Sequence, residues 1–138
     1  MTKKDLLEYR GLKREIEQCM RIMGEMRMDI ASPKAVTLDG MPKGSRKEQD
    51  PMAAAIAHYI ERSQEYADRV DAYTKRCHEI EFAIDCLPQL EREVCRWRYI
   101  NGLMWRDVAR KMYRSERSVM ELHRQALEDL LDVDDFTD

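Results

Sequence analysis

The chain has 138 residues, of which 43% are hydrophobic and 37% are charged, and its formal net charge is −3. This apolar content excludes a disordered chain, and the low numbers of glycine (5) and proline (4) predict few turns and long elements. No apolar run approaches the roughly 18 residues of a membrane span and no signal peptide is recognisable, so we expect a cytoplasmic protein without a membrane partner. Apolar residues recur at intervals of three and four, which predicts an all-α fold.

Charge is distributed unevenly along the chain. Residues 90–128 carry nine Arg or Lys against six Asp or Glu, whereas residues 129–138 carry five Asp and no base. A mildly basic block therefore lies between a nearly neutral body and an acidic tail, which we assign to 132–138. Local charge steers contact with nucleic acid more than the total charge does.

The first predicted helix covers about residues 2–31, with Thr2 as its N-cap and Ser32-Pro33 as its end. Its apolar residues follow alternating steps of three and four, the spacing of a heptad seam: Tyr9, Leu12, Ile16, Cys19, Met23, Met26 and Ile30. The following segment, 32–50, holds two of the four prolines and a cluster of Lys and Arg, and a third proline, Pro51, follows it directly. We expect it to be a mobile linker without a catalytic role.

The second predicted helix covers about residues 51–87, with Asp50 as N-cap and Pro51 at its first position. Its seam continues the same spacing through Ile56, Tyr59, Ser63, Tyr66, Val70, Tyr73, Cys77, Ile80, Ile84 and Leu87. Two such helices joined by one linker predict a long antiparallel hairpin over residues 1–87. Because two helices bury little surface, we expect a homo-oligomer that associates through this hairpin.

Residues 88–131 are predicted to form a three-helix helix-turn-helix unit that begins at Pro88. Its helices cover about 89–100, 104–112 and 115–131, with Gly102 as a left-handed cap and Ser115 as an N-cap. The short spacing between the second and third helices is typical of a helix-turn-helix. The predicted inward residues are Val94, Trp97 or Arg98, Val108, Ala109, Met112, Val119, Leu122, Ala126 and Leu127. Ala109 is small, as a close helix crossing requires.

The third helix of this unit would be the recognition helix, whose first residues enter the major groove of double-stranded DNA. Arg117 could donate to guanine and an acid could accept from cytosine, while bases near the turn would contact phosphates. The predicted DNA-binding residues are Arg110, Lys111, Arg114, Ser115, Glu116, Arg117, Ser118, Met120, Glu121 and Arg124. Taken singly, these residues are also compatible with an ordinary solvated surface.

Catalysis and metal binding are not expected. The four cysteines have no Cys-x-x-Cys spacing, and three of them fall on apolar stripes, which predicts buried free thiols. The three histidines, His58, His78 and His123, are scattered, and we expect His123 on the flank of the recognition helix. No nucleophile elbow or phosphate-binding loop is present, so the sequence predicts no catalytic residue, no metal site and no cofactor.

The C-terminal region resembles the last region of bacterial housekeeping sigma factors, which binds the upstream promoter element. The resemblance covers about 40 residues and rests on LEREV at 90–94, RYING at 98–102, WRDVA at 105–109, SERSV at 115–119 and Ala126-Leu127. The whole chain is similar to a family of short phage and prophage proteins of Gram-positive bacteria. Members of that family pair a helical hairpin, a loop such as Gly40-Met41-Pro42 and a sigma-like unit, which implies a regulator of late transcription.

Three features depart from the sigma pattern. Met104 stands where Ser or Thr is usual at the N-cap of the second helix, which should cost about 1 kcal/mol. Ser118 and Met120 stand where sigma regions often carry basic residues. The sequence therefore favours a non-enzymatic transcription regulator that binds duplex DNA. The alternative is an interaction or assembly protein that contacts RNA polymerase or another phage protein without binding DNA.

Overall fold

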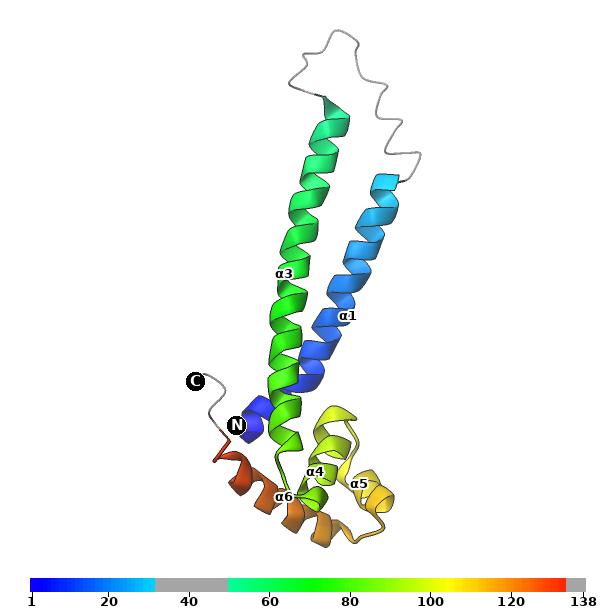
Figure 1. Ribbon diagram of the computed structural model, residues 1–138. Coiled ribbons are helices and arrows are strands. Elements are labelled where there is room, and N and C mark those ends of the chain that lie inside the picture. Colours follow the sequence, from blue (N-terminus) through cyan, green and yellow to red (C-terminus); the bar gives the residue numbers. More distant parts are fainter. Residues whose placement is uncertain (32–49, 134–138) are drawn as a thin grey trace. The chain divides into compact units, whose positions relative to one another are not determined.

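A computed structural model describes residues 1–31 and 50–133, and each element in these ranges is a helix (Figure 1). The elements are α1 (Lys3–Ala31), α3 (Pro51–Asp85), α4 (Gln89–Cys95), the π-helical turn η3 (Arg96–Ile100), α5 (Trp105–Met112) and α6 (Glu116–Leu130). The all-α prediction is thus confirmed. The expected linker, apart from Asp50, and the last five residues of the expected tail lie outside the described residues. Within the described ranges, no helix is sufficiently long and apolar to cross a membrane.

The chain divides into two compact units, and the division passes through both long helices. Unit 1 comprises Met1–Arg14 and Tyr73–Asp138, and unit 2 comprises Glu15–Ala72. This division differs from the boundary predicted between residues 87 and 88. The difference arises because the first turns of α1 contact residues far along the chain within unit 1.

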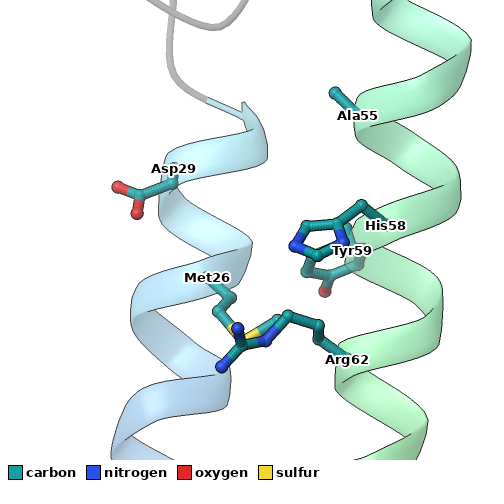
Figure 2. Close-up of a pocket in the computed structure, with 6 residues that line it drawn as sticks. All are labelled: Met26, Asp29, Ala55, His58, Tyr59 and Arg62. Atoms are coloured by element: carbon teal, nitrogen blue, oxygen red, sulfur yellow. The ribbon is translucent and has the colours of Figure 1, made fainter.

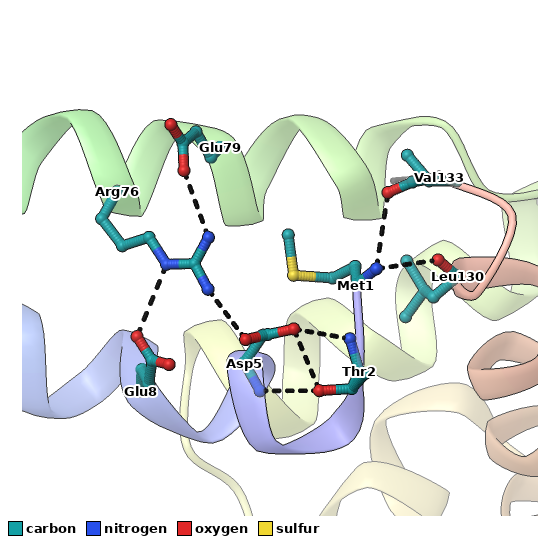
Figure 3. Close-up of polar contacts among 8 residues, drawn as sticks. All are labelled: Met1, Thr2, Asp5, Glu8, Arg76, Glu79, Leu130 and Val133. Atoms are coloured by element: carbon teal, nitrogen blue, oxygen red, sulfur yellow. Dashed lines mark hydrogen bonds and ion pairs between the residues drawn. The ribbon is translucent and has the colours of Figure 1, made fainter. Parts of the chain in front are cut away.

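Contacts of the first helical turns hold unit 1 together (Figure 3). Arg76 on α3 donates to Asp5 at 2.9 Å and to Glu8 at 3.4 Å. The amine of Met1 donates to the carbonyl oxygen of Leu130 at 3.2 Å, at the end of α6. These bonds link the start of α1 to α3, and Met1, just before α1, to the end of α6. Residues 1–14 therefore belong to the same packed unit as the C-terminal helices.

The helix starts follow the predicted capping. Thr2 and Asp5 form a reciprocal capping box, in which each backbone N–H donates to the side-chain oxygen of the other residue. The backbone N–H of Met52 donates to the Asp50 carboxylate at 3.0 Å, and that of Ser118 donates to Ser115 Oγ at 3.1 Å. These bonds satisfy N–H groups that have no partner within their own helices.

The helix expected over 89–100 is not α-helical throughout. It ends as an α-helix at Cys95 and continues as η3, where the N–H of Asn101 donates to the carbonyl of Arg96, five residues back. Gly102 then adopts the predicted left-handed conformation, with φ of 74°. A Cβ atom at Gly102 would collide with the Arg10 guanidinium, which also donates to the carbonyl of Ile100 at 3.2 Å.

The core of the C-terminal helices is formed by four buried residues, Val94, Val108, Ala109 and Val119, with Trp97, Leu103, Trp105, Met112 and Leu122 packed against them. Most of the predicted inward residues are therefore confirmed. Arg98 is not one of them, since its guanidinium lies over the Trp105 ring, 4.6 Å from its centroid. Cys19, Cys77 and Cys95 are buried free thiols as expected, whereas Cys86 is exposed.

Unit 2 has a thin interior. Of its described side chains only Cys19 is buried, and several large apolar side chains are exposed, namely Met20, Met28, Met52, Ile56 and Ile60. An open groove of about 340 Å³ lies between its two helical segments and is lined by Met26, Asp29, Ala55, His58, Tyr59 and Arg62 (Figure 2). The two segments therefore leave part of their apolar surface in contact with water.

Candidate nucleic-acid interface

The connection between α5 and α6 is a tight, hydrogen-bonded turn. The N–H of Tyr113 donates to the carbonyl of Arg110 at 3.3 Å, and the N–H of Arg114 donates to that of Ala109 at 3.0 Å. This pair of bonds defines a Schellman motif at the end of α5. Ser115 follows at once as the N-cap of α6. The first turn of α6 is thus held at a set distance from the end of α5.

All ten predicted DNA-binding residues lie on α5, on this turn or on α6. Nine of them are exposed: Arg110, Lys111, Arg114, Ser115, Glu116, Arg117, Met120, Glu121 and Arg124. Ser118 is half-buried, and its backbone N–H is used by the cap. The side chains that remain available to a ligand therefore come from the end of α5, the turn and one face of α6.

Arg124 is engaged by two acidic neighbours. Its Nη2 donates to Glu121 at 2.6 Å, and its Nη1 donates to Glu128 at 2.6 Å. The hydrogen bond from Arg124 lowers the pKa of Glu121. The positive charge of Arg124 is compensated within α6, which makes it a poor phosphate contact. Its spacing of three and four residues from these acids is a sequence feature that could have indicated the pairing.

The basic residues near the turn have fewer acidic partners than Arg124 has. Arg110 Nη1 is 3.8 Å from Asp107 Oδ1. The Lys111 ammonium lies over the Trp97 ring, 5.4 Å from its centroid. Among the described residues, no hydrogen bond or ion pair engages the side chain of Arg114 or Arg117. No described acid pairs with either arginine, although Glu116 lies between them in the first turn of α6, whose free N–H groups favour an anion.

Tyr113 also belongs to this surface, although it is not among the residues predicted from the sequence. It is 95% exposed and occupies the left-handed region, with φ of 56° and ψ of 42°. A Schellman motif requires such a residue and usually has glycine there. The lack of glycine between Met112 and Ser115 is the sequence feature that could have drawn attention to Tyr113.

His123 lies on the buried face of α6, which corrects the expectation that it lies on the flank of this helix. Only 5% of His123 is exposed, and its Nε2 is hydrogen-bonded to the Tyr99 hydroxyl at 2.6 Å. The Trp105 ring packs edge-on against it, with centroids 4.5 Å apart. Burial, together with the charges of Lys3 and Arg98, lowers the pKa of His123 to about 4, so the imidazole is neutral at pH 7.

The lowered pKa of His123 predicts a loss of stability in acid. The imidazole must remain neutral in the folded chain, while in the unfolded chain it accepts a proton at its ordinary pKa of 6.5. Its contribution is therefore fully present above about pH 6.5 and is lost as the pH falls towards 4, by up to roughly 3 kcal/mol. The measurement is the free energy of unfolding of the wild type minus that of His123→Gln, determined between pH 4 and 7.

The difference in the free energy of unfolding between wild type and variant separates the contribution of His123 from that of Glu91. The Glu91 carboxyl changes stability with pH in the opposite direction. Burial and a hydrogen bond with Asp129 raise the pKa of Glu91 between α4 and α6, so Glu91 stabilises the fold at low pH and loses this effect as the pH rises. Because the wild type and the His123→Gln variant both keep Glu91, its contribution cancels in the difference. A difference that does not change between pH 4 and 6.5 would contradict the prediction.

The start of α5 offers a second stability test. Met104 is the N-cap of α5 and is exposed, and its side chain makes no capping hydrogen bond. A serine in this extended conformation can accept from a free N–H of the first turn. Met104→Ser should therefore raise the free energy of unfolding by about 1 kcal/mol, measured by urea titration. Met120→Ser, an exposed position inside α6, is the matched control and should not be stabilising.

Neither a chelating cluster nor a similar protein adds to this description. In the described part of the chain, no group of three or more His, Cys, Asp or Glu is arranged to hold a metal ion. Comparisons with family models, curated proteins and solved structures find no match.

Proposed function

We propose that this chain is a cytoplasmic, non-enzymatic transcription regulator that binds double-stranded DNA. In this proposal, α4 with η3, α5 and α6 act as a helix-turn-helix unit like that of sigma factors, and α1 with α3 acts as a helical hairpin. Arg114 and Arg117 carry the proposal, since they present positive charge at the exposed start of α6 and no described acid pairs with their side chains. A helix with free N–H groups and adjacent arginines is suited to a phosphate backbone and to the edges of guanine.

Binding would place the first turn of α6 in the major groove. Arg110, Lys111 and Arg114 would then lie near phosphates, and Arg117 would lie near base edges. Arg124 would contribute little, because Glu121 and Glu128 already accept its hydrogen bonds. With three or four phosphate contacts per chain, the affinity should depend steeply on salt.

Fluorescence anisotropy with a labelled duplex tests the proposal. The duplex should have about 20 base pairs, two helical turns, so that two recognition helices can bind one face. We expect binding at low salt and a slope of log K against log salt near about −3 per chain. If no duplex is bound at low salt, including one with the promoter region beside the gene, the proposal is wrong.

The alternative function is that of an interaction protein that contacts RNA polymerase. The exposed apolar side chains of unit 2 favour this reading, because surfaces of this kind bind other proteins. Co-purification with polymerase before and after nuclease digestion distinguishes the two functions. Retention that does not depend on DNA would favour the alternative.

We further propose that unit 2 self-associates with a second copy of the chain. Most of its described seam residues are only half-buried, Ile56 is exposed, and its open groove leaves apolar surface for a partner helix. Because heptad seams are repeated along both helical segments, another copy presents the complementary pattern. Sedimentation equilibrium should give a mass above the 16.4 kDa of one chain, and a strictly monomeric mass would contradict self-association.

A further inference from the structure

We infer that Tyr113 is a contact residue for the DNA backbone, an inference that rests on the proposed function. Tyr113 is the one residue other than glycine with positive φ in the part of the chain that the structure describes. A bulky residue in this conformation is strained, because its Cβ approaches the backbone closely. Strain of this kind is found preferentially at functional sites.

The fold itself does not explain the tyrosine side chain. It is 95% exposed, and within the described residues its hydroxyl makes no hydrogen bond and its ring packs on no other ring. The backbone bonds of the Schellman motif, from Tyr113 to Arg110 and from Arg114 to Ala109, require only the left-handed conformation. Glycine would adopt this left-handed conformation without strain, as Gly102 does with φ of 74° at the turn before α5.

The neighbours of Tyr113 indicate the ligand. Lys111 precedes it, Arg114 follows it directly, and Arg117 lies on the first turn of α6. When a recognition helix enters the major groove, the preceding helix crosses the phosphate backbone, so the turn between them lies close to the phosphates. A tyrosine there can donate its hydroxyl to a phosphate oxygen and pack its ring on the adjacent sugar.

The test is a comparison of stability and DNA affinity in Tyr113→Gly and Tyr113→Ala. The glycine variant relieves the strain, so its Tm should rise by about 3 °C, while its affinity for the duplex should fall about five- to tenfold. The alanine variant keeps the strained conformation and lacks the ring, so it should bind as weakly as the glycine variant without the gain in Tm. Opposite changes in stability and affinity would support the inference.

Gly24→Ala is the matched control for stability alone. A Cβ at Gly24 meets no atom within 4 Å, and alanine favours the helix, so this variant should also gain stability. It lies in unit 2 and should bind DNA as the wild type does. Circular dichroism checks that each variant keeps its helicity.

The outcomes separate the inference from the proposed function. If the wild type binds duplex DNA and both Tyr113 variants bind equally well, the inference is wrong and the proposed function stands. If only the glycine variant binds weakly, a rigid turn rather than the ring is required, which also overturns the inference. If the wild type binds no duplex, the proposed function fails and the inference fails with it.

Discussion

Replacing Arg114 and Arg117 together by alanine should lower the affinity for duplex DNA by about 100-fold. Each side chain would contribute a contact worth roughly 1–3 kcal/mol, and a change of 1.4 kcal/mol is a factor of ten. The slope of log K against log salt should also decrease by about 1, because the phosphate contact of Arg114 is lost, whereas Arg117 lies near base edges. Fluorescence anisotropy over a series of salt concentrations measures both quantities.

Arg124→Ala is the matched control for this double variant. It removes an exposed arginine from the same helix, but one whose charge Glu121 and Glu128 compensate. Its affinity for the duplex should remain within about twofold of the wild type, because Arg124 already donates to Glu121 and Glu128. The fold should also be kept, since exposed ion pairs contribute little to stability. An equally large loss in Arg124→Ala would show that the local pairing does not determine which arginine binds, and would contradict the proposed interface.

Leu6→Ala should lower the free energy of unfolding by about 3 kcal/mol, because it leaves a cavity in a closely packed core. Leu6 is 1% exposed and lies in the part of α1 that belongs to unit 1. The Tm of this unit should fall by about 10 °C. Trp97 and Trp105, both packed on the core of the C-terminal helices, report its unfolding through their fluorescence.

The adjacent residue, Leu7, gives a matched control for Leu6. Leu7 is 59% exposed, so Leu7→Ala should change the free energy of unfolding by no more than about 0.5 kcal/mol. If Leu6→Ala leaves the tryptophan transition unchanged, the first turns of α1 do not stabilise the C-terminal helices. The division of the chain into its two compact units would then be wrong.

Much of the candidate site follows from local patterns in the sequence. The N-cap at Ser115, the left-handed Gly102 and the inward positions of Val108 and Val119 depend on residues within one or two turns, so spacing alone predicts them. The pairing of Arg124 with Glu121 and Glu128 is also local, because these acids lie three and four residues from it.

Other features depend on residues distant in the chain. His123 lies four residues after Val119 and three before Ala126, so the apolar spacing within α6 could have indicated its burial. Its partners Tyr99 and Trp105 come from other elements, and spacing within α6 does not identify them. Arg10 occupies the space beside Gly102, although 92 positions separate them by residue number. Such contacts arise only when the elements assemble.

The sequence by itself determined that the chain is helical, where its helices start and which of their faces are apolar, because helix periodicity and capping act over a few residues. Only the tertiary structure decided that the first turns of α1 pack with the C-terminal helices, that Tyr99 and Trp105 contact His123, and that Tyr113 is exposed in a strained conformation. Burial and pKa shifts depend on which surfaces meet, and that is decided by the packing of whole helices.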